Sequence, residues 1–295
     1  MRRRRNTFWL LWLLLAGLAC GPALSSAPTA GVPASTAGVP APTWTPAPPP
    51  PSPTFLPPPT ATQPVVLDTG WEVLRPGLER RRRRIVGAEQ QLLEVVTLFR
   101  VDPAFFRFDV AYRPGDPQTM QTWQAETGAL LLVNGGYFTE AYLATGLIVA
   151  GGQASGQSYG SFAGMLAVTA AGPTLRWLAE EPYDPAEPLR AALQSFPILV
   201  RPDGGAAYPD DGGPPARRTV IGQDQRGRIL FLVAPYGSFT LHALSRFLAD
   251  SDLDLRLAVN LDGGTSSGFL LADPSESITP LVRLPAVIAV YPRSP

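Results

Sequence analysis

The sequence predicts an α+β fold, in which a strand-rich mixed sheet carries few helices. Between residues 67 and 295, short segments rich in Val, Leu, Ile and Phe alternate with Gly, Pro and Asp, which is the pattern of strands and turns. Only two segments of this region have helical composition. A doubly wound parallel sheet needs a helix between most consecutive strands, so the scarcity of helices argues against it.

The predicted strands are short and follow one another closely. The first two are expected to form a hairpin, because Asp102 and Pro103 lie between them and favour a turn. In chain order the expected strands are residues 92–101, 107–112, 129–133, 147–150, 165–169, 175–178, 198–201, 220–223, 229–233, 257–261, 269–272 and 287–291.

Two helices are predicted. Residues 120–127 favour helix, and Gly128 follows them as a stop signal. Residues 240–249 place four large apolar side chains on one face, and Thr240 stands where an N-cap is expected.

Residues 1–20 have the features of an export signal. Four arginines precede an apolar run at residues 8–16, which is too short for the roughly 20 residues of a membrane-spanning helix. Cys20 is the only cysteine, and its place after this run resembles the lipid-attachment site of bacterial lipoproteins, although Gly17 departs from that pattern. We expect an exported protein that is lipid-anchored through Cys20 to the cell membrane and faces away from the cytoplasm; the alternative is an ordinary signal peptide with an incidental cysteine.

Residues 21–66 are dominated by Pro, Ala, Thr and Ser. Up to residue 64 this stretch contains no charged side chain and cannot bury a core, so it is expected to be a disordered linker. Without the first 19 residues and their four arginines, the chain has 20 basic and 24 acidic residues, a formal charge of about −4. Attraction to nucleic acid is therefore not expected.

The chain offers few groups for metal or nucleophilic chemistry. His242 is the only histidine, and Cys20 lies outside the expected domain, so a zinc site of several His and Cys ligands is excluded. A Ser-His-Asp triad would have to use His242, which lies on the second predicted helix and is interpreted as a structural or surface residue.

Two segments each place a polar residue at the end of an apolar strand, directly before two glycines. They are Asn134-Gly135-Gly136 and Asp262-Gly263-Gly264. Glycines in this position let the backbone approach a ligand, and their amides can form a nest for an anion. The alternative is a pair of tight turns in which Asn and Asp serve turn chemistry.

Arginines occur in two different settings. Arg217 and Arg218 precede a predicted strand, where a guanidinium can bind phosphate oxygens in a bidentate fork. The run at residues 80–84 has no glycine or aromatic residue around it, so a solvated edge or a general attraction to anionic polymers is expected there.

Four segments in order resemble the phosphodiester glycosidase family. That family carries an NGGFF-like strand end, a strand with a proline and a glycine, an RTxxG segment and a closing NLDGGGS segment. The corresponding residues here are 134–138, 195–204, 218–222 and 260–266. Tyr137, Thr139 and Thr265 depart from the family pattern. The resemblance covers nearly all of residues 70–295 and predicts one domain of this type at residues 67–295.

The resemblance implies hydrolysis of a glycosidic bond whose leaving group is a phosphate ester. Such a group leaves as a stabilised anion, whereas the oxocarbenium-like centre still benefits from a carboxylate. The expected catalytic residues are Asp262 as the carboxylate, Arg218 as the phosphate ligand and Asn134 as an orienting group. The expected substrate-binding residues are Gly135, Gly136, Tyr137, Thr219, Asn260, Gly263, Gly264 and Ser266.

Several alternatives stay open at this point. Glu140 is a weak candidate for a second carboxylate. No cofactor or metal is expected, but a divalent cation could bind Asp262 together with Asn oxygens, since hard cations prefer oxygen ligands. The expected partners are a glycan or sugar-phosphate substrate and the membrane, with the protein a monomer. The competing function is a non-catalytic envelope lipoprotein that binds glycans or phosphorylated polysaccharide.

Overall fold

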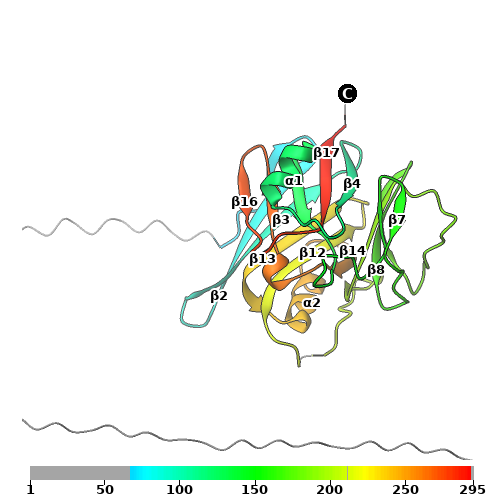
Figure 1. Cartoon of the computed structure of the whole chain (residues 1–295). Coiled ribbons are helices and arrows are strands. Elements are labelled where there is room, and N and C mark those ends of the chain that lie inside the picture. Colours follow the sequence, from blue (N-terminus) through cyan, green and yellow to red (C-terminus); the bar gives the residue numbers. More distant parts are fainter. Residues whose placement is uncertain (1–66, 211, 294–295) are drawn as a thin grey trace, which may run out of the picture. The chain divides into compact units, whose positions relative to one another are not determined.

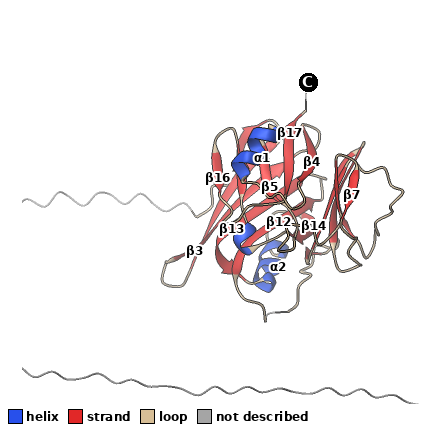
Figure 2. Ribbon diagram, in the orientation of Figure 1, coloured by secondary structure: helices blue, strands red, loops and turns tan. Residues whose placement is uncertain are grey.

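The computed structural model of the chain describes residues 67–210 and 212–293. These residues form three β-sheets and two α-helices (Figures 1 and 2), and every pair of neighbouring strands in them runs antiparallel. The predicted strand-rich fold with few helices is confirmed. The export signal, Cys20 and the linker at 21–66 lie outside the described residues. Within the described part, no helix is long and apolar enough to span a membrane.

The largest sheet has seven strands. Its order is β1 (Glu72–Arg75), β2 (Leu78–Val86), β3 (Leu92–Val101), β13 (Ile229–Phe239), β12 (Ala216–Asp224), β14 (Leu255–Asn260) and β11 (Ile198–Val200). The three strands β12, β14 and β11 carry segments of the family pattern, and they are neighbours here although they are far apart in the sequence.

Two five-stranded sheets complete the fold. One has the order β16 (Glu276–Ile278), β15 (Phe269–Leu271), β5 (Leu131–Asn134), β17 (Ala286–Pro292) and β4 (Phe106–Tyr112). The other has the order β7 (Gln153–Ser155), β6 (Ile148–Ala150), β10 (Ala191–Ser195), β8 (Gly164–Thr169) and β9 (Gly172–Trp177).

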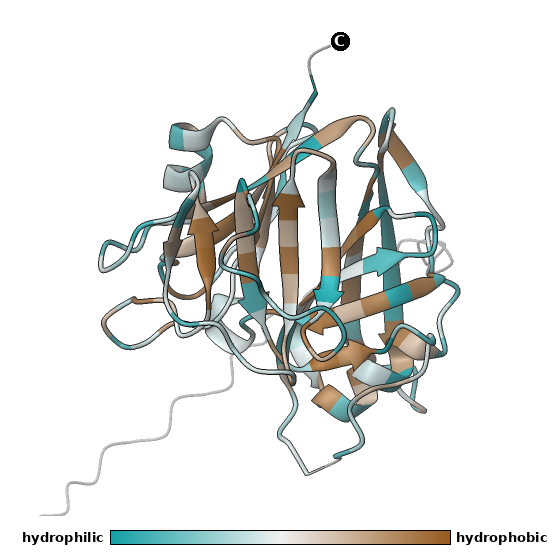
Figure 3. Ribbon diagram, turned by 90° about the vertical axis from the view of Figure 1, so that its right-hand side faces the viewer, coloured by the Kyte–Doolittle hydropathy of each residue, from teal (hydrophilic) through white to brown (hydrophobic). Residues whose placement is uncertain are grey.

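The main hydrophobic core lies where the three sheets meet. It combines side chains from all of them, and the ring of Phe99 on β3 meets that of Phe269 on β15 edge to face at a centroid distance of 4.8 Å. Hydrophobic residues lie along many of the strands (Figure 3). Burial of these apolar faces is what holds the sheets against one another.

Both predicted helices are present with the expected ends. Helix α1 (Met120–Thr127) ends at Gly128, which has φ +65° and donates its N–H to the Gln124 carbonyl. In α2 (Leu241–Ala249), the side chain of Thr240 accepts a hydrogen bond from Ala243 N–H at 3.0 Å. The apolar face of α2 packs on the seven-stranded sheet.

The predicted hairpin of the first two strands is wrong. Strand β3 pairs with β2 and β13, and β4 pairs with β17 in another sheet. Asp102 does make a turn, since its carbonyl accepts from Phe105 and Phe106 N–H groups. However, β3 has neighbours on both edges and leaves no place for β4, so the chain crosses to a different sheet after the turn.

Candidate active site

The side chain of Asn134 connects the first glycine loop, residues 134–136, with the second glycine loop, residues 262–264. Its side chain is completely buried at the end of β5. The amide Nδ2 donates to the Asp262 carbonyl at 2.7 Å, and Oδ1 accepts from the Thr219 hydroxyl at 2.8 Å and from Gly268 N–H at 3.1 Å. Every strong contact of this amide is therefore made to protein, across two sheets, and the residue fixes the position of the loop that carries Asp262.

Asn260 has a similar place at the end of β14. Its Nδ2 donates to the Tyr137 hydroxyl and to the Leu261 carbonyl, both at 2.7 Å. Its Oδ1 is buried without a hydrogen-bond partner among the described residues. An unpaired buried acceptor costs free energy, which is the usual mark of a group that is kept for a ligand or a bound water.

The paired glycines are required by close packing against protein. A β-carbon at Gly135 would stand 2.9 Å from the Ala286 carbonyl oxygen, and one at Gly136 would stand 2.8 Å from that of Gln194. Gly135 is buried and donates its N–H to Ala286, so this amide is not free for the anion nest expected from the sequence. In the second loop a β-carbon at Gly263 would stand 2.9 Å from the Arg217 carbonyl oxygen, while Gly264 has φ +58°.

Asp262 is a part-buried carboxylate at the start of the second loop. Burial raises its pKa to about 6, although hydrogen bonds from the buried Ser266 and from Gly263 N–H oppose the shift. Its backbone N–H donates to the Gly135 carbonyl at 3.2 Å, so the two loops hold it from both sides. A carboxyl group that changes its charge near pH 6 can exchange protons under physiological conditions.

Arg218 approaches the same loop from β12. A β-carbon on Gly263 would stand 3.8 Å from its Nη1 atom. Its Nε donates to the Phe239 carbonyl at 3.0 Å and its Nη2 to the Pro214 carbonyl at 2.9 Å, whereas no carboxylate of the described residues pairs with it. Burial lowers its pKa, but a guanidinium remains charged at any physiological pH. The site thus contains a fixed cation without a counter-ion in the described part of the chain.

The neighbouring Arg217 binds backbone carbonyls that follow the second glycine loop. Its Nη2 donates to the carbonyls of Ser267 and Thr279 at 2.8 and 3.2 Å, and burial lowers its pKa. Its contacts to two carbonyls beyond Asp262 indicate a supporting role.

A cluster of four aromatic rings adjoins these groups and was not predicted from the sequence. Phe196 lies 4.7 Å from Tyr137, 5.1 Å from Tyr159 and 5.4 Å from Phe162, measured between ring centroids. The Asp262 charge contributes to a raised pKa at both Tyr137 and Tyr159, after the larger effect of burial, which places both phenols near this carboxylate. Phe162 is 56% exposed and is the open face of the cluster. The one signal in the sequence was that Tyr159 and Phe162 lie among Ser and Gly at residues 158–162.

The other candidates of the sequence lie apart from this cluster or serve the fold. Glu140 is exposed on the loop after β5. Nδ1 of His242 lies 3.0 Å from the Tyr208 carbonyl oxygen, in agreement with a structural role. Thr219 is completely buried and reaches the site only through Asn134. In the described part of the chain no three His, Cys, Asp or Glu side chains are placed to share a metal ion.

Comparisons with known proteins identify the family and the fold of this chain. The sequence profile of the phosphodiester glycosidase family matches residues 127–291, more than half of the chain. The catalytic domain of zebrafish N-acetylglucosamine-1-phosphodiester alpha-N-acetylglucosaminidase, auto-inhibited by its pro-peptide, has a similar fold, with a TM-score of 0.59 and 19% identity over 74% of this chain and 85% of that chain. A hypothetical protein from Synechocystis aligns with a TM-score of 0.49 and 14% identity over 74% of this chain and 62% of that chain. No match was found among curated protein sequences.

Proposed function

Because this chain belongs to the phosphodiester glycosidase family, we propose that it hydrolyses a sugar-1-phosphodiester, between the anomeric carbon and the phosphate oxygen, at the cell envelope. The observation that carries the proposal is the part-buried carboxylate of Asp262, with its raised pKa, in the same cluster as the Arg218 guanidinium. The two form no ion pair. A substrate can therefore use both charges.

Asp262 and Arg218 suit the two ends of the bond that breaks, which joins the anomeric carbon to a phosphate oxygen. A water oxygen bonds to the anomeric carbon as the carbon–oxygen bond to phosphate breaks, and the bonding electrons pass to the phosphate oxygen. Above about pH 6 Asp262 is ionised and would stabilise positive charge at the anomeric carbon and accept the proton of the water. The Nη1 atom of Arg218, which makes no hydrogen bond to any residue that the structure describes, would hold the phosphate.

The described residues around Asp262 favour a mechanism with one carboxylate. Burial and two hydrogen bonds account for its shifted pKa, and no acidic side chain contributes to it. A phosphate leaving group fits this arrangement, because it departs as a stable anion and needs no strong general acid. Asn134 and Asn260 would act as positioning residues that keep the carboxylate and the Tyr137 ring in place.

The aromatic cluster supports a sugar as the group beside Asp262. Glycan-binding sites use exposed aromatic rings to cover the apolar face of a pyranose. Phe162 offers such a ring, and it packs on Tyr159, whose pKa responds to the Asp262 charge. The name of the zebrafish relative gives an N-acetylglucosamine 1-phosphodiester as its substrate, so this class is the first to test.

The test compares wild-type protein with Asp262→Asn on an N-acetylglucosamine 1-phosphodiester. We expect turnover to fall by about three orders of magnitude or more, because the variant keeps the shape of the side chain and loses its charge. Asp250→Asn, whose side chain is 70% exposed, is the matched control and should retain full activity. A fully active Asp262→Asn would reject the catalytic assignment. Wild-type protein that binds the substrate and never cleaves it, with or without divalent cations, would favour the glycan-binding lipoprotein.

A further inference from the structure

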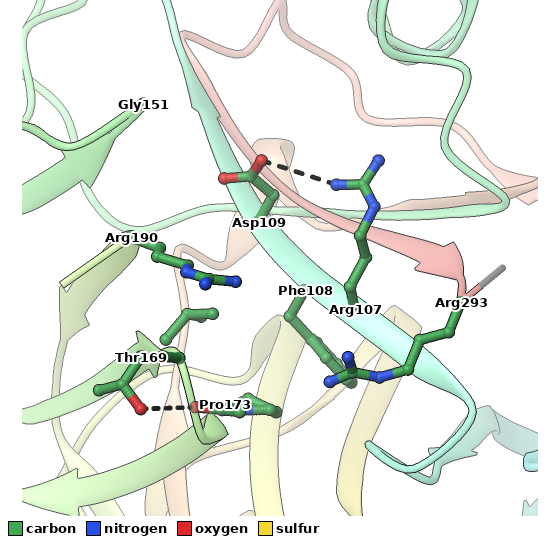
Figure 4. Close-up of a pocket in the computed structure, with 11 residues that line it drawn as sticks. Arg107, Phe108, Asp109, Gly151, Thr169, Pro173, Arg190 and Arg293 are labelled. Atoms are coloured by element: carbon green, nitrogen blue, oxygen red, sulfur yellow. Dashed lines mark hydrogen bonds and ion pairs between the residues drawn. The ribbon is translucent and has the colours of Figure 1, made fainter.

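A cavity away from the candidate active site contains three arginines and none of the candidate active-site residues. It has a volume of about 200 Å³. One wall is formed by β4 and the end of β17, and the opposite wall by the sheet that contains β8, β9 and β10 (Figure 4). Arg107 comes from β4, Arg190 directly precedes β10 and Arg293 directly follows β17. We refer to it as the arginine cavity.

Two of the three guanidinium groups have no carboxylate partner among the described residues. Nε of Arg293 donates to the Pro103 and Phe106 carbonyls at 2.8 and 3.1 Å, which fixes the group, and neither of its terminal nitrogens has an acceptor among residues 67–210 and 212–293. Arg190 is exposed, and its side chain makes no hydrogen bond or ion pair in the described part of the chain. Figure 4 shows these two side chains extending toward each other from opposite walls.

The third arginine does not balance this charge. Arg107 lies over the Tyr291 ring, with its guanidinium carbon 3.6 Å from the ring centroid, and its closest approach to the Asp109 carboxylate is 3.9 Å. One carboxylate therefore faces three guanidinium groups, which gives the cavity an excess of about two positive charges at any pH where Asp109 is ionised. An oxyanion that bridges Arg190 and Arg293 would relieve their mutual repulsion.

A wider groove of about 800 Å³ continues from the arginine cavity. The two share four residues, namely Gly151, Thr169, Ala170 and Arg190. The remaining walls of the groove are small or apolar, and Gly151 has open space where a β-carbon would project. Such a groove has room for a sugar ring that is attached to the anion, whereas an isolated ion would leave it empty.

We propose that the arginine cavity binds the phosphate group of a sugar phosphate or phosphorylated glycan, whose saccharide lies along the adjoining groove. The ligand class follows from the planar guanidinium donors, which match phosphate oxygens, and from the neutral groove beside them. The proposal does not depend on the catalytic role of Asp262. It would give an envelope protein a second contact with a phosphorylated polymer.

The test is calorimetric titration of the full chain at constant ionic strength. The four probes are glucose 6-phosphate, inorganic phosphate, glucose and phosphatidylglycerol vesicles. Glucose 6-phosphate has no bond between its anomeric carbon and the phosphate, so the proposed hydrolysis cannot consume it. We expect glucose 6-phosphate to bind more tightly than inorganic phosphate, and glucose not to bind. Replacing both Arg190 and Arg293 with Ala should weaken glucose 6-phosphate binding at least ten-fold. The exposed pair Arg84 and Arg226, changed to Ala together, removes the same charge elsewhere and should have no effect.

Two further variants separate this cavity from the candidate active site and from misfolding. Arg190→Glu changes only an exposed side chain and should also weaken binding, whereas Arg218→Ala should leave a binding event of unchanged affinity. Absence of binding by the wild type, unchanged binding after the double replacement, or loss of all binding in Arg218→Ala would overturn the proposal. Binding of vesicles without binding of glucose 6-phosphate would overturn the assignment to a glycan.

Discussion

Asp262 occupies a position that opposes its own ionisation. Burial raises its pKa from an ordinary value of 3.8 to about 6, so the folded protein binds one proton more than the unfolded chain between these two values. The free energy of unfolding contributed by this residue is therefore highest below pH 3.8 and falls as the pH rises to about 6. A shift of this size corresponds to about 3 kcal/mol at most. Keeping such a destabilising charge is typical of residues that serve function.

Asp262→Asn should remove the loss of folding stability that the wild-type carboxylate causes when it ionises above about pH 6. Near pH 4 we expect the variant and the wild type to have similar free energies of unfolding, because the side chain at position 262 is then neutral in both folded proteins. At pH 8 the variant should be more stable, by up to about 3 kcal/mol. Urea unfolding between pH 4 and 8 checks the prediction, with Asp250→Asn as the exposed control. A variant that gains no stability at pH 8 would show that the charge of Asp262 is better solvated than its burial indicates.

Phe162 is expected to serve substrate binding and to contribute little to folding. Its ring is 56% exposed and packs against the rings of Tyr159 and Phe196. Phe162→Ala should raise KM for a sugar-1-phosphodiester about 10-fold and change the melting temperature little, since one stacked ring contributes about 1 to 2 kcal/mol. Tyr236→Ala removes an aromatic ring that is 61% exposed on β13 and is the control. An equal change of KM in both variants would argue against a role for the cluster.

The sequence predicted which residues of the candidate site lie close together better than it predicted the contacts that each of them makes. A polar residue before two glycines at a strand end was enough to select Asn134 and Asp262. Nothing local to residue 134 indicated that its side chain would be buried and bonded to residues 219, 262 and 268, because these contacts depend on how two sheets meet. The aromatic cluster was missed for the same reason, since Tyr137, Phe162 and Phe196 come together only in the folded chain.

At the scale of the elements, β2 shows how a charged run can form an interior strand. The strand carries the arginines 80–84, for which the sequence predicted a solvated edge or a general attraction to anionic polymers, yet β1 and β3 flank it on both sides. Arg80 pairs with Glu72 and Glu276, and Arg81 pairs with Asp68 and Asp252. The acidic partners are up to 196 positions away in the sequence, so a pattern confined to residues 80–84 could not reveal them.

Arg81 is the least exposed arginine of this strand, with 9% of its side chain accessible. Its guanidinium lies 2.6 Å from Asp68 and 2.9 Å from Asp252, and its hydrogen bond lowers the pKa of Asp68 to about 2. We expect Arg81→Met to lower the free energy of unfolding by about 1 to 2 kcal/mol at pH 7, a modest value because both acidic partners are partly exposed. Arg84→Met on the same strand removes an exposed charge and should cost less than 0.5 kcal/mol, on the order of other surface substitutions.

The pH dependence gives an independent check on this ion pair. Because the pKa of Asp68 is lowered in the folded state, its contribution to stability is present above pH 3.8 and is lost as the pH falls toward 2. Denaturant unfolding of wild type and Arg81→Met should therefore converge in this range. A difference that stays constant from pH 7 to pH 2 would show that Arg81 acts through packing against Trp71.

At the scale of the whole molecule, the candidate active site lies where two sheets join. Asn134 belongs to the sheet that contains β5, whereas Arg218 and Asn260 belong to the seven-stranded sheet. Five strands, namely β1, β2, β7, β10 and β16, were not expected from the sequence. The positions of most of the others could be predicted from local patterns to within two residues. Which strands become neighbours could not, because pairing is decided by burial across the molecule and by the edges that remain free. The false hairpin of β3 and β4 is the clearest case.

The arrangement of the chain as a whole leads to a prediction about its place in the cell. Cys20 lies 47 positions before the first described residue, Leu67, and we propose that a lipid on this cysteine holds the domain at the membrane through the linker at 21–66. Cys20→Ser should move the protein from the membrane fraction to the soluble exported fraction. Its turnover of a sugar-1-phosphodiester per molecule should stay within about two-fold of wild type, because no residue of the candidate site is changed.

Fractionation of cells and partition into detergent measure this shift, and incorporation of a labelled fatty acid identifies the lipid directly. Ser25→Ala, a change of similar size five residues further along the chain, is the control and should leave the protein in the membrane fraction. A Cys20→Ser protein that remains in the membrane and still carries residues 1–19 would show that the apolar run itself is the anchor. In that case an uncleaved signal would set how far the domain can lie from the membrane. The proposed contact between the arginine cavity and envelope polymers would still apply, since it depends only on the described residues.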